Sequence, residues 1–210
     1  MNEINVTIFM NKKTLYFLRH GQSVYNKLNI LQGRIDSPLS DEGENEAKVV
    51  APKFKKLELR HIAHSPLLRA KQTAMIINEQ LNLPISQWQD IQEMSFGDWQ
   101  HELKYEYWDG FKHDFYEHGS PPPGGESRNQ VYRRVEKEVH NICKNVDDSP
   151  ILVACHGMVI RILLGEWFTN ATEKGFRSIK VPNLGVFKVE VEYDETRITP
   201  ISCKHINLSS

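Results

Sequence analysis

Thr14-Leu15-Tyr16-Phe17-Leu18 runs directly into Arg19-His20-Gly21, and this stretch decides the fold. A short run of apolar and aromatic residues is typical of a buried strand. A second such run, Ile151-Leu152-Val153-Ala154-Cys155, leads into His156-Gly157. Polar groups just beyond the carboxyl ends of strands line the crevice of open α/β sheets. We therefore expect two central parallel strands that bring both histidines to the same rim.

Helical patterns alternate with these strands along the chain. Ser40-Asp41-Glu42 predicts a helix start, with the helix running to about Leu57, because serine caps a helix and carboxylates favour its N-terminus. After a weak strand at 61–64, Ser65-Pro66 predicts a second helix start with serine as the N-cap. Two more helices are expected from about Ser127 and after His156. Residues 187–193 alternate apolar with charged, which predicts a strand covered on one face, antiparallel or near an edge.

This order of elements predicts the fold class and the domain organisation. We expect an α/β fold with a mostly parallel central sheet flanked by helices on both faces. Residues 1–210 are interpreted as a single domain. The aromatic residues after 98 and the Ser-Pro-Pro-Pro-Gly-Gly stretch at 120–125 predict a short insertion or lid over the active site, spanning about 98–126.

Composition narrows the class of protein. Of the 210 residues, 40% are apolar and 25% are charged, and the formal net charge is −1, so no basic excess suggests a nucleic-acid partner. Residues 1–10 show no secretion-signal pattern, and no stretch is long enough to span a membrane. Three widely spaced cysteines indicate reduced thiols. We expect a cytoplasmic protein that acts on a small molecule without a membrane or nucleic-acid partner, and a homodimer is left open.

The two histidines and two arginines suit phosphoryl transfer. Arg69 falls in the first turn of the helix expected after Ser65-Pro66, where the helix N-terminus favours an anion. One guanidinium group can bind two phosphate oxygens at once, and neutral imidazole is a competent nucleophile. Such a site neutralises the phosphoryl charge with side chains, so we expect neither a metal nor a cofactor.

Several stretches together resemble the histidine phosphatase superfamily, which includes the cofactor-dependent phosphoglycerate mutases. A bare Arg-His-Gly would be a weak signal, whereas five motifs in the right order are specific. They cover about residues 14–191 and read Leu18-Arg19-His20-Gly21-Gln22-Ser23-Val24-Tyr25-Asn26, Gln32-Gly33 with Asp36-Ser37-Pro38-Leu39, Ser65 to Ala74, Glu93 to Trp99, and His156-Gly157 with Arg161.

The resemblance implies a role for each matching residue. His20 would be the phosphorylated nucleophile, and Glu93 would protonate the leaving oxygen and then activate water, if burial raises its pKa. The remaining positions would contact the phosphate or the pocket: Arg19, Asn26, Gln32, Gly33, Arg69 and His156. The resemblance thus implies a phosphoglycerate-mutase-like fold and a metal-independent phosphomonoester hydrolase with a phosphohistidine intermediate.

Two alternatives stay open, and a third is rejected. A mutase would return the phosphoryl group to a second substrate oxygen, but the short segment after Glu93 and the Gly124-Gly125-Glu126-Ser127 turn favour a phosphatase. A phosphate-ester-binding protein without turnover would lack a nucleophile or clamp residue. Cys155 and Arg161 match the Cys-x5-Arg spacing of cysteine phosphatases, but the residues between them indicate a helix rather than a phosphate-binding loop.

Overall fold

The computed structural model describes residues 10–208, apart from the side chains of Tyr105, Trp108 and Asp109. Residues 1–9, where no secretion signal is expected, lie outside the described residues, as do 209–210. The described part contains a six-stranded sheet of order β3-β2-β4-β1-β5-β6. In that order the strands are Ile85–Gln87, His61–His64, Ile151–Cys155, Asn11–Arg19, Val186–Tyr193 and Ile198–Ile206.

The sheet is mostly parallel, as predicted. β3, β2, β4 and β1 pair in parallel, whereas β5 pairs antiparallel with β1 and β6 antiparallel with β5. The strand predicted at 187–193 is therefore antiparallel and lies one place inside the edge. The sequence pattern did not predict the edge strands β3 and β6, because β3 is short and β6 is exposed over most of its length.

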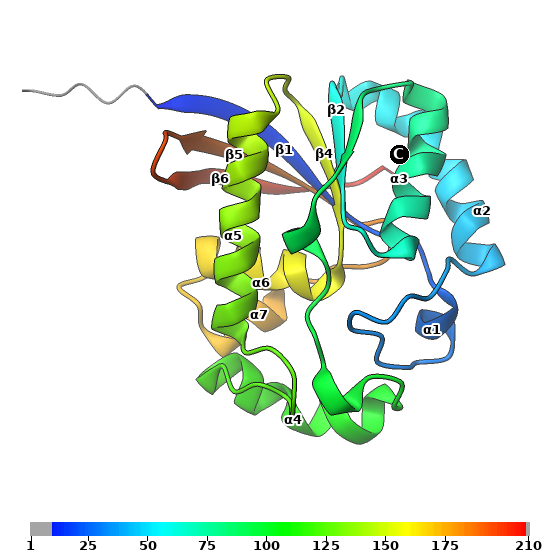
Figure 1. Ribbon diagram of the computed structural model, residues 1–210, viewed down its shortest axis with the longest axis vertical. Helices are drawn as coiled ribbons and strands as arrows, with labels where there is room; N and C mark the ends of the chain where they lie inside the picture. Colours follow the sequence, from blue (N-terminus) through cyan, green and yellow to red (C-terminus); the bar gives the residue numbers. More distant parts are fainter. Residues whose placement is uncertain (1–9, 209–210) are drawn as a thin grey trace, which may run out of the picture.

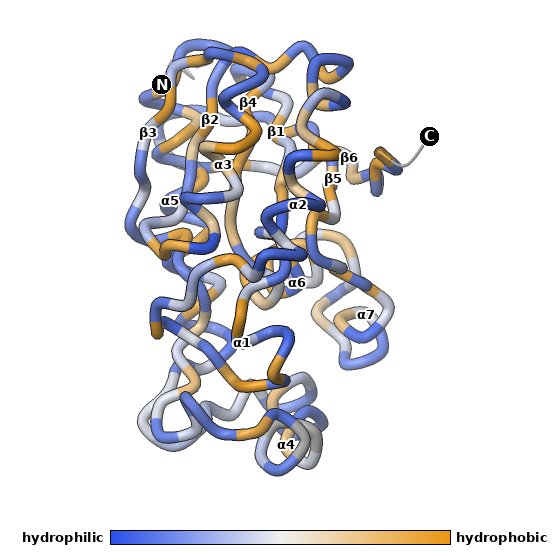
Figure 2. The backbone as a smooth tube through the Cα atoms, turned by 90° about the vertical axis from the view of Figure 1, so that its right-hand side faces the viewer, coloured by the Kyte–Doolittle hydropathy of each residue, from blue (hydrophilic) through white to orange (hydrophobic). Residues whose placement is uncertain are grey.

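Helices cover both faces of the sheet (Figure 1). Side chains alternate along β1, so Leu15 and Phe17 face one core and Tyr16 and Leu18 face the other. The first core is closed by α5 and α6, and the second by α2, η1 and α3. Figure 2 agrees with this, since β4 is largely hydrophobic and α2 largely hydrophilic. The helices are α1 Val24–Lys27, α2 Asp41–Val50, α3 Leu68–Leu81, α4 Lys104–His118, α5 Arg128–Asn145, α6 Gly157–Phe168, α7 Glu173–Ser178, and the 3-10 helices η1 Ala51–Leu57, η2 Gln89–Ile91 and η3 Gly97–Trp99.

Two predicted helix boundaries need correction. The α-helix after Ser40 ends at Val50 and continues as the 3-10 helix η1 to Leu57, because Pro52 has no N–H to donate to an α-helical bond. Ser65 is not the N-cap of α3, which begins at Leu68. The Leu68 N–H instead donates to Asp36 Oδ1 at 2.8 Å, and Asp36 lies in a loop distant in the sequence. Ser65 is used in the site described below.

The segment 98–126 lies beyond the carboxyl ends of the parallel strands (Figure 1). Backbone hydrogen bonds of 2.9 Å tie it to residues 29–31: the N–H of Leu31 donates to Glu102 O, that of His101 to Leu31 O and that of Lys104 to Asn29 O. Phe115 on α4 is fully buried, and the side chains of Tyr105 and Trp108 on the same helix lie outside the described part. No helix within residues 10–208 is both long and apolar enough to cross a bilayer.

Candidate active site

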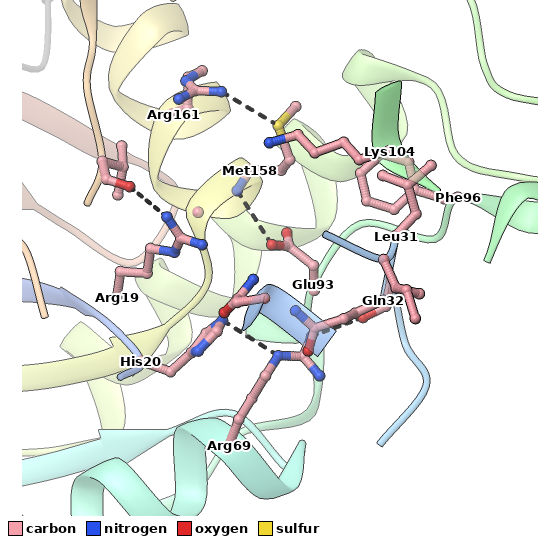
Figure 3. A pocket seen from close by; sticks show the side chains of 15 residues that line it. Arg19, His20, Leu31, Gln32, Arg69, Glu93, Phe96, Lys104, Met158 and Arg161 are labelled. Atoms are coloured by element: carbon pink, nitrogen blue, oxygen red, sulfur yellow. Dashed lines mark hydrogen bonds between the residues drawn. The ribbon is translucent and has the colours of Figure 1, made fainter. Parts of the chain in front are cut away.

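A cavity of about 130 Å³ opens at the rim where β1 and β4 end. The register of these strands explains its position, because Arg19 lies opposite Cys155 and the His20 N–H donates to Cys155 O at 3.1 Å. His20 and His156 therefore follow their strands side by side, with ring centroids 5.3 Å apart. Seven residues expected at the site line the cavity, several of them labelled in Figure 3: Arg19, His20, Asn26, Gln32, Gly33, Arg69 and Glu93.

His20 is held in one orientation by its own backbone neighbour. Its Nδ1 lies 2.7 Å from Gly21 O, and a carbonyl oxygen only accepts, so Nδ1 carries the proton. Nε2 then has the free lone pair. Burial, followed by the charges of Arg69 and Arg19, holds the pKa of His20 well below its ordinary value. The imidazole is thus neutral at physiological pH, with Nε2 as the basic atom.

Arg69 fixes one side of the cavity. Its side chain is 1% exposed, so its three nitrogens need partners within the protein. The two terminal nitrogens donate to Gly33 O at 2.8 Å and Ile35 O at 3.0 Å, and Nε donates to His20 Nε2 at 3.3 Å. Burial lowers the pKa of Arg69 to about 10, so the guanidinium is still charged at neutral pH. Gly33 thus supports the arginine through its carbonyl, in a loop where it adopts a positive φ of 53°.

Arg19 and His156 bring two buried nitrogens without partners to the same region. Arg19 Nη1 donates to Val181 O at 2.7 Å, but Arg19 Nε and His156 Nδ1 have no hydrogen-bond partner among residues 10–208. His156 Nε2 lies 2.7 Å from Ser65 Oγ, so Ser65 contacts this histidine instead of capping α3. Burial, followed by the charge of Arg69, lowers the pKa of His156 well below its ordinary value. Unsatisfied buried nitrogens of this kind suit a ligand rich in acceptor oxygens.

Glu93 lies at the N-terminus of α6. Its carboxylate accepts hydrogen bonds from the N–H groups of Met94 at 2.9 Å and of Met158 and Val159 at 3.3 Å each. A carboxylate offers about four lone-pair sites, so one remains after these three contacts. The side chain is 8% exposed and faces the cavity with His20, as Figure 3 shows. Glu93 therefore presents a carboxylate to the cavity with one acceptor site left.

Comparison with known proteins agrees with this geometry. The family model of the histidine phosphatase superfamily (branch 1) matches residues 15–204. The chain belongs to the histidine phosphatase superfamily. The phosphoglycerate-mutase-like α/β fold expected from the sequence is confirmed.

Relatives of this histidine phosphatase carry both phosphatase and mutase names. Phosphoserine phosphatase 1 of Hydrogenobacter thermophilus is 30% identical over 71% of this chain and 73% of its own. A protein of Photorhabdus laumondii named "Probable phosphoglycerate mutase GpmB" is 28% identical over 85% of each chain. The structure of a mycobacterial glucosyl-3-phosphoglycerate phosphatase in complex with VO3 has a TM-score of 0.78, at 25% identity, and covers 92% of this chain and 97% of that one.

Asn26 and Gln32 line the cavity and also make hydrogen bonds that hold the surrounding loop and α1. Asn26 Oδ1 accepts from the N–H of Ser23 at 3.2 Å and from Asn183 at 3.3 Å, and it completes the capping box of α1. Gln32 Oε1 accepts from the Ser23 hydroxyl at 2.7 Å. The carbonyl side of each amide is thus engaged, which leaves the NH2 groups as the donors. Asn183 also donates to His20 O at 3.0 Å, a support that the sequence did not reveal.

An ion-pair network holds the loop that carries Glu93. Glu126 accepts from Arg134 at 2.8 and 2.9 Å, from Arg34 at 2.7 Å and from the Ser95 N–H at 2.9 Å. Burial alone would raise the pKa of Glu126, but the hydrogen bonds and charges of the arginines outweigh it and lower the pKa. Both arginines also donate to the backbone carbonyl of Glu93, at 3.1 and 3.4 Å. In the sequence, the Gly-Gly-Glu-Ser turn pointed only to the phosphatase branch, not to this contact.

Neither His156 nor Cys155 lines the cavity. His156 is fully buried behind His20 and is not among the residues that line the cavity. Cys155 is the fully buried last residue of β4, and burial raises the pKa of its thiol far above the ordinary value. The following residues form α6 rather than a phosphate-binding loop. The Cys-x5-Arg match is therefore incidental, as the sequence indicated.

Proposed function

We propose that this protein is a metal-independent phosphomonoesterase in which His20 Nε2 attacks phosphorus. The observation that carries the proposal is the position of His20 Nε2, which lies in the cavity 3.3 Å from Nε of the buried Arg69 guanidinium. A phosphoryl group that enters the cavity would accept from Arg69 Nε in place of His20 Nε2, and from Arg19 Nε, which has no partner among residues 10–208. Positioned cations of this kind stabilise the charge on the transferring phosphoryl oxygens.

The reaction takes two steps. His20 Nε2 forms a bond to phosphorus as the ester P–O bond breaks, and Glu93 gives its proton to the departing alkoxide. Water then attacks the phosphohistidine, Glu93 takes a proton from that water, and inorganic phosphate leaves with His20 restored. The balance is one ester and one water to one alcohol and one phosphate. His156 Nδ1, which has no partner among residues 10–208, would contact the phosphoryl group, while Ser65 Oγ engages the other ring nitrogen.

A small-molecule phosphate ester is the proposed partner, and a cytoplasmic location is proposed from the cysteine usage. The phosphatase assignment over the mutase assignment is supported by the short segment between Glu93 and Gly124. Phosphate release from a panel of phosphomonoesters in EDTA tests the proposal. Activity should survive EDTA and fall with vanadate, and mass spectrometry should find phosphate on His20.

The same assay separates the alternatives. Given 3-phosphoglycerate with catalytic 2,3-bisphosphoglycerate, the protein should form little 2-phosphoglycerate. Rapid interconversion without phosphate release would instead establish the mutase. Binding of esters with neither reaction would indicate a protein without turnover, and activity that EDTA abolishes and a divalent ion restores would contradict the metal-independent route.

A further inference from the structure

Ser65 is a fully buried serine that follows β2 and precedes α3. Its hydroxyl oxygen lies 2.7 Å from His156 Nε2, and the N–H of Leu67 donates to the same oxygen at 3.3 Å. Its backbone is fixed as well, because its N–H donates to Ala154 O on β4 at 3.0 Å. The hydroxyl therefore has a defined position next to the ring of His156.

The partners of this hydroxyl decide the direction of its proton. Ser65 Oγ accepts from the Leu67 N–H and has one proton of its own to donate. Among residues 10–208, His156 Nε2 is the one acceptor with which the hydroxyl forms a hydrogen bond. If the ring donated to the hydroxyl instead, the Ser65 proton would be buried without an acceptor, which is unfavourable. The Ser65 O–H thus donates to Nε2.

This hydrogen bond sets the tautomer of His156. The ring is neutral at physiological pH, since burial and then the charge of Arg69 hold its pKa well below the ordinary value. A neutral imidazole carries a single proton, so a ring that accepts at Nε2 has that proton on Nδ1. Nδ1 is a buried nitrogen for which the described part of the chain provides no partner. The open position of the ring is therefore an N–H donor and not a lone pair.

A donor at this position suits phosphoryl transfer. The rings of His20 and His156 lie 5.3 Å apart between centroids, so a phosphoryl group on His20 Nε2 would lie beside the second ring. An N–H there stabilises the negatively charged phosphoryl oxygens, whereas a lone pair would repel them. The two rings thus use one tautomer for opposite purposes. His20, whose Nδ1 donates to Gly21 O, presents a lone pair, and His156 presents a proton.

We propose that Ser65 is a positioning residue of this phosphatase, whose hydroxyl donates to His156 Nε2 and so keeps a proton on Nδ1 for the transferring phosphoryl oxygens. The inference rests on the proposed function, because it places the phosphoryl group on His20. Ser65 does not line the cavity, so its effect passes through the ring of His156.

Ser65→Ala tests the proposal, because it removes the hydroxyl without adding bulk. Without that donor the ring can also adopt the tautomer with a lone pair on Nδ1, which opposes the phosphoryl oxygens. We expect kcat to fall by about 10- to 100-fold, the range for one hydrogen bond to a charged group. Alkyl and aryl phosphates should be affected alike, since they share these oxygens.

Ser86→Ala is the matched control. Ser86 Oγ lies 2.7 Å from His61 Nε2, so the same two atom types form a bond of the same length, but neither residue lines the cavity. This variant should keep kcat within about 2-fold of the unmodified protein. A similar loss of kcat in both serine variants would overturn the specific role of Ser65.

The tautomer can be observed directly by NMR. In protein with ¹⁵N-labelled histidine rings and bound vanadate, the ring shifts distinguish a protonated nitrogen from a bare one, and His156→Asn identifies the signals of His156 by their loss. We expect the proton on Nδ1 in the unmodified protein and a mixture of tautomers in Ser65→Ala. A serine that only supports the fold would leave the tautomer unchanged, and a proton on Nε2 in the unmodified protein would overturn the inference.

A double-mutant cycle tests the coupling by activity. The amide of His156→Asn offers an N–H close to the position of Nδ1 without depending on a tautomer. In this background Ser65→Ala should cost about 2-fold or less in kcat, because the donor no longer depends on Ser65. The same loss from Ser65→Ala with and without His156→Asn would show that the two residues act separately, and would contradict the proposal.

Failure of this inference is distinguishable from failure of the proposed function. If esters are hydrolysed through a phosphohistidine on His20 and Ser65→Ala keeps full kcat, the role of Ser65 is overturned and the phosphatase stands. If no ester is hydrolysed, the proposed function fails, and the NMR experiment decides the hydrogen bond alone. A proton on Nδ1 that becomes mixed in Ser65→Ala would then support it, and an unchanged tautomer would overturn it.

Discussion

Arg69 donates to the nitrogen of His20 that would attack phosphorus, with 3.3 Å between Nε and Nε2. One buried cation therefore performs two tasks. Burial lowers the pKa of His20 most and the charge of Arg69 lowers it further, and the same guanidinium points toward the place where the phosphoryl oxygens would lie. A permanently charged guanidinium can do both without taking the proton itself.

The stability of the protein should fall as the pH drops below about 6.5. The pKa values of His20 and His156 are held well below the ordinary value in the folded state, so between these pKa values and about 6.5 the unfolded chain binds more protons. The free energy of unfolding should then decrease by up to about 1.4 kcal/mol per pH unit for each histidine. Urea unfolding at a series of pH values from 7 to 5 measures this slope.

A variant of His156 measures how much this one histidine contributes to the pH dependence of the unfolding free energy. His156→Gln removes a buried titrating group, so its unfolding free energy should depend less on pH over the same range. His118→Gln, an exposed change on α4, should keep the slope of the unmodified protein. Parallel slopes for the unmodified protein and His156→Gln would show that His156 does not titrate differently on unfolding.

Turnover should depend on His20 and not on Cys155. His20→Ala removes the nitrogen that accepts from Arg69 Nε and should abolish phosphate release. Cys155→Ala and Cys155→Ser should both retain most activity, because the thiol is buried at the end of β4 and its raised pKa disfavours a thiolate. Circular dichroism establishes that each variant is folded. A folded but inactive Cys155→Ala would make the cysteine the nucleophile.

The strand register explains why so much of this site could be predicted from the sequence. Two buried strands that each end in His-Gly need only be parallel neighbours to place His20 beside His156, and β1 and β4 are such neighbours. Ser65 was misassigned because a serine before proline usually caps a helix, whereas here it pairs with His156 across a separation of 91 residues. Contacts of this range depend on the tertiary fold and leave no local pattern.

The contributions of Lys104 and Arg161 to the cavity and the support of Glu93 were not predicted, for the same reason. Lys104 and Arg161 look like ordinary charged helix residues until α4 and α6 are brought together. Glu126 and Arg134 lie eight residues apart along the chain, a separation that gives no helical signal when one of them is in a turn. The family motif marked Glu126 as notable, but only the structure gives it a physical task.

Glu126→Gln should weaken both the fold and the acid step. The change removes a charge that two arginines share, and the partly buried arginines lose hydrogen-bonded partners, so we expect a loss of about 1–3 kcal/mol in the free energy of unfolding. Because those arginines also hold the carbonyl of Glu93, the hydrolysis of alkyl esters should slow more than that of aryl esters. Glu117→Gln, on the exposed face of α4, is the matched control and should change neither. Equal slowing of both esters would limit Glu126 to a role in stability.

Glu93→Gln should reveal the general acid through the leaving group. An alkyl phosphate departs as a basic alkoxide and needs a proton, whereas p-nitrophenolate departs readily without one. The amide keeps a carbonyl oxygen to accept from the α6 N–H groups but has no acidic proton, so phosphorylation of His20 by alkyl esters should slow by about 10² to 10⁴ and by aryl esters far less. Single-turnover kinetics measure this step apart from the attack of water.

Arg69→Ala provides the contrast for Glu93. The guanidinium stabilises phosphoryl oxygens that both ester classes share, so its removal should slow alkyl and aryl esters to a similar extent. Arg69→Lys restores a charge but not the contacts with Gly33 O, Ile35 O and His20 Nε2 together, and should recover little activity. If Glu93→Gln instead harms both ester classes equally, the proton must come from another carboxyl, and Asp98 is the next to test. Asp98 follows Glu93 by five residues along the chain, and its N–H donates to Pro123 O at 2.9 Å.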